Sequence, residues 1–149
     1  MTAEDIALEI VGEDLPTDLA LLQSEAKAEG YRFIERLADE WASGAARFDK
    51  PGELLLIARC QGQLAGIGGI TIDPFDTAAL RMRRFYVRPA FRRSGVAGTL
   101  AGALISRALE TGRELTVNAG TDVAPPFWER MGFIPVDAEH HTHIWPSEL

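Results

Sequence analysis

The sequence predicts an α/β domain with a mixed, mostly antiparallel central sheet of about six to seven strands and helices on both faces. Two observations support this prediction. Three short apolar runs lie between residues 54 and 87 and are separated by turn residues, as in an antiparallel meander. A helical segment and another strand come next, and such a strand–helix–strand connection normally joins parallel strands.

The elements are expected in the order β-α-α-β-β-β-α-β-α-β-β. Apolar residues at helical spacing predict helices at 15–30, 31–44, 95–111 and 125–132. Apolar runs between turns predict strands at 6–11, 54–60, 64–72, 80–87, 114–119, 133–136 and 141–145. Glycines 66, 68 and 69 fall inside one of these strands, which indicates a bulge or a close approach of two backbones.

Length and composition indicate one globular domain spanning residues 1–149. The formal net charge of -7 argues against a general nucleic-acid or anionic-membrane binder, because phosphate-rich partners select basic surfaces. The single cysteine, Cys60, excludes an intrachain disulfide and is expected in the core. No apolar run reaches the ~20 residues of a membrane span and no secretion signal is visible, so a cytoplasmic protein is expected.

Positive charge is concentrated in one stretch of this acidic chain. Residues 81–93 hold six of the 15 basic residues, and a run of Ser, Gly and Ala follows. Ser94 is a candidate N-cap for the helix that begins there, and the small residues let an anion approach the free N–H groups of its first turn. The spacing matches neither the P-loop nor the dinucleotide fingerprint, yet the stretch suits a phosphate or pyrophosphate.

The motif R-x-x-G-x-A at Arg92–Ala97 resembles the acyl-CoA pyrophosphate loop of the GNAT (GCN5-related N-acetyltransferase) superfamily, [QR]-x-x-G-x-[GA]. The longer segment RRFYVRPAFRRSGVAGTLAGALISRA is similar to the family's fourth strand, loop and third helix. APPFWERMGF is similar to its C-terminal segment A-x-x-F-Y-E-K-x-G-F. The likeness covers about residues 54–136 by motif and nearly the whole chain by element order.

The resemblance implies direct transfer of an acetyl group from acetyl-CoA to a primary amine of a small molecule or peptide, without a metal. It places the pyrophosphate on the turn at 93–98 and the pantetheine arm on the main chain near Phe85, Tyr86 and Val87, like an added strand. A bulge in that strand would open the cleft. The residues expected to bind the cofactor are Phe85, Val87, Arg92, Arg93, Ser94, Gly95, Val96, Ala97, Gly98, Phe127, Trp128 and Arg130.

The expected proton-transfer groups depart from the family pattern. Trp128 stands where relatives often have a tyrosine acid, and an indole N–H cannot protonate a thiolate at neutral pH. Water is one alternative acid, and Tyr86 is another if its side chain faces the cleft. Residues 77–109 contain no carboxylate, so the usual strand glutamate is missing. The remaining candidate bases are Asp73, Asp76, Glu35, Asp39, His141 and His143.

Of these groups, Tyr86, His143 and Asp73 are the predicted catalytic residues. An imidazole titrates near neutrality, which suits proton removal from an amine. His141 and His143 share one face of a strand, and the alternative is that this strand is a polar, exposed edge. Such an edge would also suit a homodimer.

Two arginines are candidate substrate-binding residues. Arg83 and Arg84 point to opposite faces of a strand unless a bulge intervenes. They either pair with the acidic surface or select an acceptor that carries a carboxylate or phosphate. The alternative to an enzyme is a CoA-binding sensor or partner-binding domain that has lost its chemistry.

Overall fold

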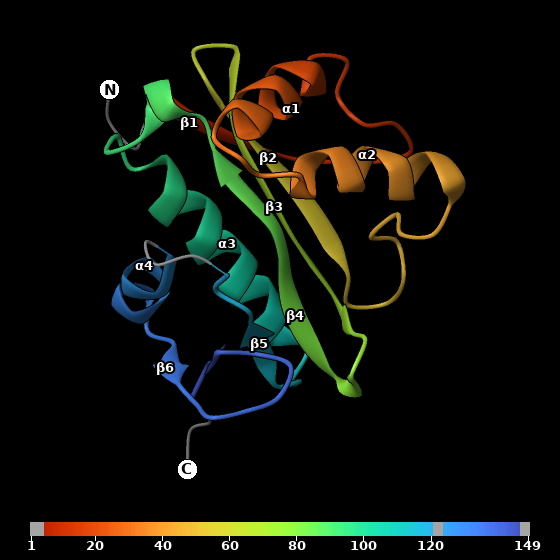
Figure 1. The fold of residues 1–149 in the computed structure, drawn as a ribbon, viewed down its shortest axis with the longest axis vertical. Coiled ribbons are helices and arrows are strands. Elements are labelled where there is room, and N and C mark those ends of the chain that lie inside the picture. The colour runs from red at the N-terminus through yellow and green to blue at the C-terminus, as the bar shows by residue number, and fades with distance from the viewer. Residues whose placement is uncertain (1–4, 121–123, 147–149) are drawn as a thin grey trace.

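The computed structural model describes residues 5–120 and 124–146. They form a seven-stranded sheet in the order β1-β2-β3-β4-β5-β7-β6 (Figure 1). Only β4 and β5 run parallel, and every other neighbouring pair is antiparallel. The predicted fold class is therefore confirmed.

The predicted order of elements is also confirmed, with shifts at several boundaries. The strands are β1 (Ile6–Ile10), β2 (Leu54–Cys60), β3 (Gln63–Asp73), β4 (Asp76–Val87), β5 (Leu115–Val117), β6 (Ile134–Pro135) and β7 (His143–Ile144). The helices are α1 (Leu19–Ala28), α2 (Phe33–Ser43), α3 (Val96–Glu110) and α4 (Ala124–Met131). The first helix begins later than expected, because residues 16–18 form a turn in which the Pro16 carbonyl accepts from the Leu19 amide.

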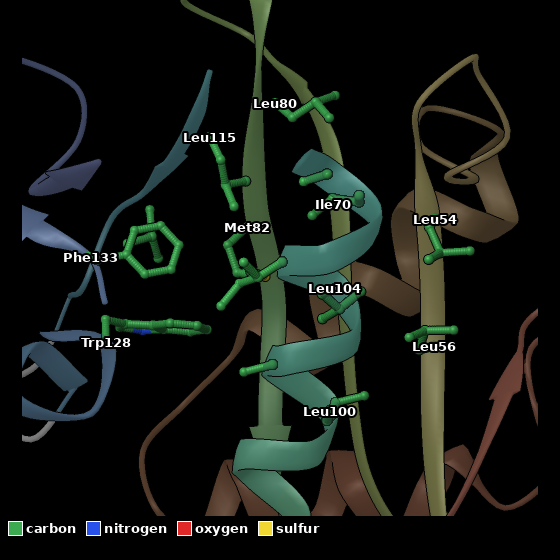
Figure 2. Close-up of a cluster of buried hydrophobic side chains, with 14 residues drawn as sticks. Leu54, Leu56, Ile70, Leu80, Met82, Leu100, Leu104, Leu115, Trp128 and Phe133 are labelled. Atoms are coloured by element: carbon green, nitrogen blue, oxygen red, sulfur yellow. The ribbon is translucent and has the colours of Figure 1, made fainter. Parts of the chain in front are cut away.

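Helices cover both faces of the sheet. Helices α1 and α2 lie on one face and α3 on the other, with α4 beside β5 and β6 (Figure 1). Figure 2 shows Leu100 and Leu104 of α3 against β3 and β4, while Trp128 and Phe133 reach the same cluster from the side of β5. A second cluster, which includes Tyr86, fills the space between α1, α2 and the sheet.

The sheet opens between its two parallel strands. β4 pairs with β5 only at Leu80–Leu115 and Arg81–Thr116, and then continues to Val87 without a strand on that side. β5 turns instead to β7, where Val117 is opposite His143. One long edge of β4 is therefore free for an extended ligand.

The late strand expected to be an exposed edge is an inner strand. β7 lies between β5 and β6, and His143 is only 3% exposed. This corrects the expectation of a polar edge at 141–145. It also removes the observation that favoured a homodimer through that segment.

A bulge bends β4 beside the opening. Arg84 has a φ of 55°, and Gly68 alone stands opposite the two residues Arg84 and Phe85. The Phe85 ring covers Gly68 so closely that a Cβ there would lie 2.7 Å from it. The glycines of β3 therefore mark a bulge and close approaches, as the sequence indicated.

Candidate active site

The N-terminus of α3 has no side-chain cap. Gly95 is the N-cap residue and adopts a φ of 91°, which favours glycine. Ser94, the predicted cap, instead donates its hydroxyl hydrogen to the Phe91 carbonyl. The expectation for Ser94 as N-cap is wrong, because its hydroxyl already has this local acceptor. The first-turn N–H groups at Val96, Ala97 and Gly98 are left with no intrahelical acceptor.

Nothing crowds these N–H groups. A Cβ on Gly98 would have no heavy atom within 4 Å, and one on Gly95 would meet only the Ile6 side chain, at 3.8 Å. Arg93 is exposed, has a φ of 64° and makes no hydrogen bond or ion pair within residues 5–120 and 124–146. The turn thus combines free donors, a helix dipole and an exposed cation, which fits a phosphate group.

The free edge of β4 leads to this turn. The Arg88 amide bonds the Ala65 carbonyl on β3 at 2.9 Å. In an antiparallel ladder, the preceding residue directs its polar groups the other way, so the Val87 main chain faces the opening. Phe85 has the same orientation, because Tyr86 is paired toward β3. Phe85 can therefore offer its amide and carbonyl to an extended ligand, and Val87 its amide, because the Val87 carbonyl already accepts from Arg92.

Aromatic rings form a wall on the α3 side of the opening. Phe85 lies 5.6 Å from Phe127 and 5.0 Å from Trp128, measured between ring centroids. Trp128 is 5% exposed and also contacts Phe133 at 5.5 Å. Its indole is enclosed by other rings, which supports a role in the wall. Arg130, on the same helix, is exposed.

Arg92 has acceptors within the protein. Its two terminal nitrogens bond Glu29, the C-cap residue of α1, at 2.8 and 2.6 Å, and its Nε donates to the Val87 carbonyl at 3.1 Å. Arg88 makes the equivalent pair with Glu25, one helical turn earlier on α1. Part of the positive charge in this stretch therefore holds α1 against the end of β4.

Tyr86 faces the same helix. Its ring is 4% exposed in the cluster under α1 and α2, and its hydroxyl donates to Glu29. Burial and the neighbouring Glu29 carboxylate raise the pKa of the Tyr86 phenol well above its usual range. The condition on which Tyr86 was a candidate acid is not met, because its proton points to Glu29.

Asp73 lies in a buried network at the end of β3. It is 1% exposed, and its carboxylate accepts from the Phe75 amide and the Thr116 hydroxyl, both at 2.9 Å. Arg81 stands 3.8 Å from the same carboxylate. These contacts fix the β3–β4 turn and β5 and leave Asp73 no exposed oxygen for an incoming amine.

His143 joins β7 to α4. Its Nε2 lies 2.8 Å from Glu129 and its Nδ1 lies 2.7 Å from the Thr142 hydroxyl. The Thr142 hydroxyl also accepts from the Ala119 amide, two residues after β5. Both ring nitrogens thus have partners, and the imidazole ties α4 to the strand beside the opening.

The bulge gathers the remaining arginines on one face. Arg81 and Arg83 point away from α3, because the residues that alternate with them, Leu80 and Met82, lie in the α3 cluster. Arg84 follows the bulge and pairs with Glu40 on α2, so it lies on that face too. Arg84 was expected to point opposite to Arg83 unless a bulge intervened. The structure has that bulge, so the two side chains lie on the same face.

Several partners escaped the sequence reasoning. Glu25 and Glu29 are four residues apart on a helix and so share one face, which is a signal that was present in the sequence. Glu40 and Glu129 gave no such signal, and their contacts with Arg84 and His143 join different elements of the fold.

Cys60 is buried as expected, and burial raises the pKa of its thiol. Among the described residues, no cluster of three or more metal-ligating side chains is present. No helix in that part of the chain has the length and apolarity needed to cross a bilayer.

Comparisons with known proteins agree with this geometry. The sequence model of the acetyltransferase (GNAT) domain matches residues 22–144, and the chain belongs to this family. By family it is therefore an N-acetyltransferase that uses acetyl-CoA as its co-substrate. No curated protein sequence matches the chain significantly.

Solved structures show the same fold. A protein from Exiguobacterium sp. 255-15, assigned as an acetyltransferase, is 26% identical with a TM-score of 0.84, over 94% of this chain and 92% of that one. An acetyltransferase from Salmonella typhimurium that modifies the N-terminal serine of ribosomal protein L7/L12 is 14% identical, with a TM-score of 0.67 over 95% and 92%. The PaiA N-acetyltransferase from Thermoplasma acidophilum, solved with coenzyme A, is 20% identical, with a TM-score of 0.62 over 93% and 96%.

Proposed function

We propose that this protein transfers the acetyl group of acetyl-CoA directly to a primary amine of a small molecule or peptide. The observation that carries the proposal is the succession of two sets of main-chain groups without partners in the sheet or helix. The edge of β4 beyond Arg81 has no neighbouring strand, and the uncapped first turn of α3 comes after a short loop at residues 88–95. Together they suit a ligand with a pyrophosphate at one end and an extended arm.

The residues present fit acetyl-CoA. The amides of residues 93–98 and the exposed Arg93 would hold its pyrophosphate, and the main chain of Phe85 and Val87 would hold its arm. Phe127 and Trp128 would close the side of the opening nearest α3. Acetyl-CoA supplies the activated acyl group, as a thioester.

Catalysis would depend mainly on positioning. The three predicted proton-transfer residues, Tyr86, Asp73 and His143, are all buried and hydrogen-bonded. The chain's contribution is to hold both reactants in one orientation, which can supply much of a rate enhancement. Protons would then leave the amine and reach the thiolate through water.

The same burial favours one alternative. A domain that binds coenzyme A and lacks a proton-transfer group can act as a sensor or as a partner-binding module. Steady-state release of free CoA separates the two functions. We expect release that requires both acetyl-CoA and an amine, with an acetylated product identified by mass. Binding of acetyl-CoA without release across a broad amine panel would favour the sensor.

A further inference from the structure

The face of β4 that lies toward α2 carries more positive charge than its neighbours offset. Arg81, Arg83 and Arg84 all point to this face. In a regular strand Arg84 would point to the opposite face from Arg83, but the bulge at Arg84 turns its side chain to the same face. Two carboxylates, Asp73 and Glu40, stand close to this cluster. The cluster therefore has one cation in excess.

The excess cation is Arg83. Arg84 is paired with Glu40, and Arg81 lies 3.8 Å from Asp73. Arg83 is half-buried and makes no hydrogen bond or ion pair with any residue that the structure describes. Burial lowers the pKa of its guanidinium, and repulsion from Arg84 adds to the effect. A desolvated cation without a counterion is unfavourable, and an anionic ligand would relieve this cost.

Two more donors on this face lack acceptors. The Thr71 hydroxyl and Arg81 Nη1 are buried and have no hydrogen-bond partner within the described parts of the chain. Thr71 is 7% exposed and pairs with Arg81 across β3 and β4, and Gly69 pairs with Arg83 in the next position on this face. Residues opposite each other in an antiparallel pair share a face, so these donors adjoin Arg83.

Arg83 also lies at the right point along β4. Arg81 is the last residue of β4 paired with β5, and Phe85 is the first whose main chain is proposed to hold the cofactor arm. Arg83 sits between them, where the sheet opens. An anion bound there would keep the rest of the same molecule beside the end of that arm.

We propose that Arg83 is the anion-binding residue of the acceptor site, so that the acceptor is a primary amine that also carries a carboxylate or phosphate. This inference rests on the proposed acetyl transfer. Arg84 is assigned a different task, since its pair with Glu40 holds α2 against the bulge. A guanidinium suits the binding role because it can donate two parallel hydrogen bonds to an oxyanion.

Matched pairs of amines test this assignment. An α-amino acid is compared with its amide, and an aminoalkyl phosphate with the corresponding amino alcohol, by kcat/KM for acetylation. We expect the wild type to prefer the anionic member of at least one pair, and the preferred pair identifies the oxyanion. Arg83→Gln should lower kcat/KM for that member by about 10- to 100-fold and leave the neutral member within about threefold.

A control variant separates binding from net charge. Arg32→Gln, at the N-cap of α2, removes the same charge from a side chain that is 69% exposed, and should leave the preference intact. If Arg83→Gln does not fold, Arg83→Lys keeps the charge but loses the two parallel donors, and a partial loss of the preference is expected.

Failure of the inference differs from failure of the proposed function. Two results would overturn the assignment of Arg83 alone. One is that the wild type acetylates charged and neutral amines with equal kcat/KM. The other is that Arg83→Gln keeps the wild-type preference for the charged amine. Binding of acetyl-CoA with no acetylation of any amine overturns the proposed function. In that case the anion site is tested by thermal stabilisation with the amino acid in the presence of CoA. No difference between wild type and Arg83→Gln there would overturn the anion site as well.

Discussion

Replacing Gly98 by glutamate should weaken acetyl-CoA binding strongly without destabilising the fold. Gly98 is the third residue of α3, and a Cβ there meets no atom within 4 Å, so a longer side chain has room. A carboxylate at this position can accept hydrogen bonds from the first-turn N–H groups. It would then occupy the donors proposed to hold the pyrophosphate.

The two expected effects have opposite signs. Losing two charge-assisted hydrogen bonds, at about 1.5 kcal/mol each, weakens binding by about 3 kcal/mol, or about 100-fold. Glutamate is a better helix former than glycine by about 0.5–1 kcal/mol, and a negative charge near a helix N-terminus adds about 0.3–1 kcal/mol. The free energy of unfolding should therefore stay constant or rise while the affinity falls.

Calorimetric titration with acetyl-CoA and urea denaturation measure the two effects. Gly102→Glu is a matched control, because Gly102 lies one turn later in α3 and also has an open Cβ position. It changes net charge equally and should shift the dissociation constant by less than about threefold. Equal loss in both variants would mean simple charge repulsion. Unchanged binding by Gly98→Glu would refute the role of the α3 N-terminus.

Three further predictions concern the supports of the site. The Arg92 guanidinium and the Tyr86 hydroxyl hold the pKa of Glu29 below its usual range, so the unfolded state binds the extra proton as pH falls. At pH 7, Glu29→Gln should lower the free energy of unfolding measured with urea by about 1–2 kcal/mol. This difference from wild type should shrink as pH falls below about 4.5, where an ordinary glutamate titrates. A difference that stays constant with pH would contradict this account. Trp128→Phe should keep turnover within a few-fold, because the indole N–H cannot act as an acid. Trp128→Ala should lower the free energy of unfolding by about 3–5 kcal/mol. Lost turnover in a folded Trp128→Phe with normal cofactor affinity would argue for a catalytic indole. Gly69→Ala would place a Cβ 2.5 Å from the Phe48 ring and 2.9 Å from the Leu54 carbonyl, so thermal denaturation should show a loss of unfolding free energy above about 3 kcal/mol. Gly12→Ala, at a position with open space, should lose about 0.5 kcal/mol or less. Similar stabilities of the two variants would contradict the close approach at Gly69.

The sequence was sufficient for the fold because local signals agree with the global arrangement. The apolar runs of β2 and β3 and the glycine stops after α2 and α3 are short-range features, and each survives in the structure. The turn before α3 was found in the same way. Its glycines are needed locally, as the φ of Gly95 shows.

The chemistry of single side chains was harder to predict, because it depends on partners distant in sequence. Nothing local to Tyr86 reveals that its hydroxyl meets Glu29, 57 residues earlier. Alternation along a strand would have separated Arg83 from Arg84, and one residue in the left-handed region reverses that result. The order in which strands pair is not local either. The segment of β7 was interpreted as an edge strand, but β7 lies between β5 and β6.

Backbone amide spectra recorded during titration with acetyl-CoA test the central claim most directly. We predict that the amide signals of residues 93–98, together with those of Phe85 and Val87, shift to saturation at one common dissociation constant. Saturable binding that leaves these amides unchanged, and shifts others instead, would contradict the assignment of the cofactor to the β4 edge and the α3 N-terminus.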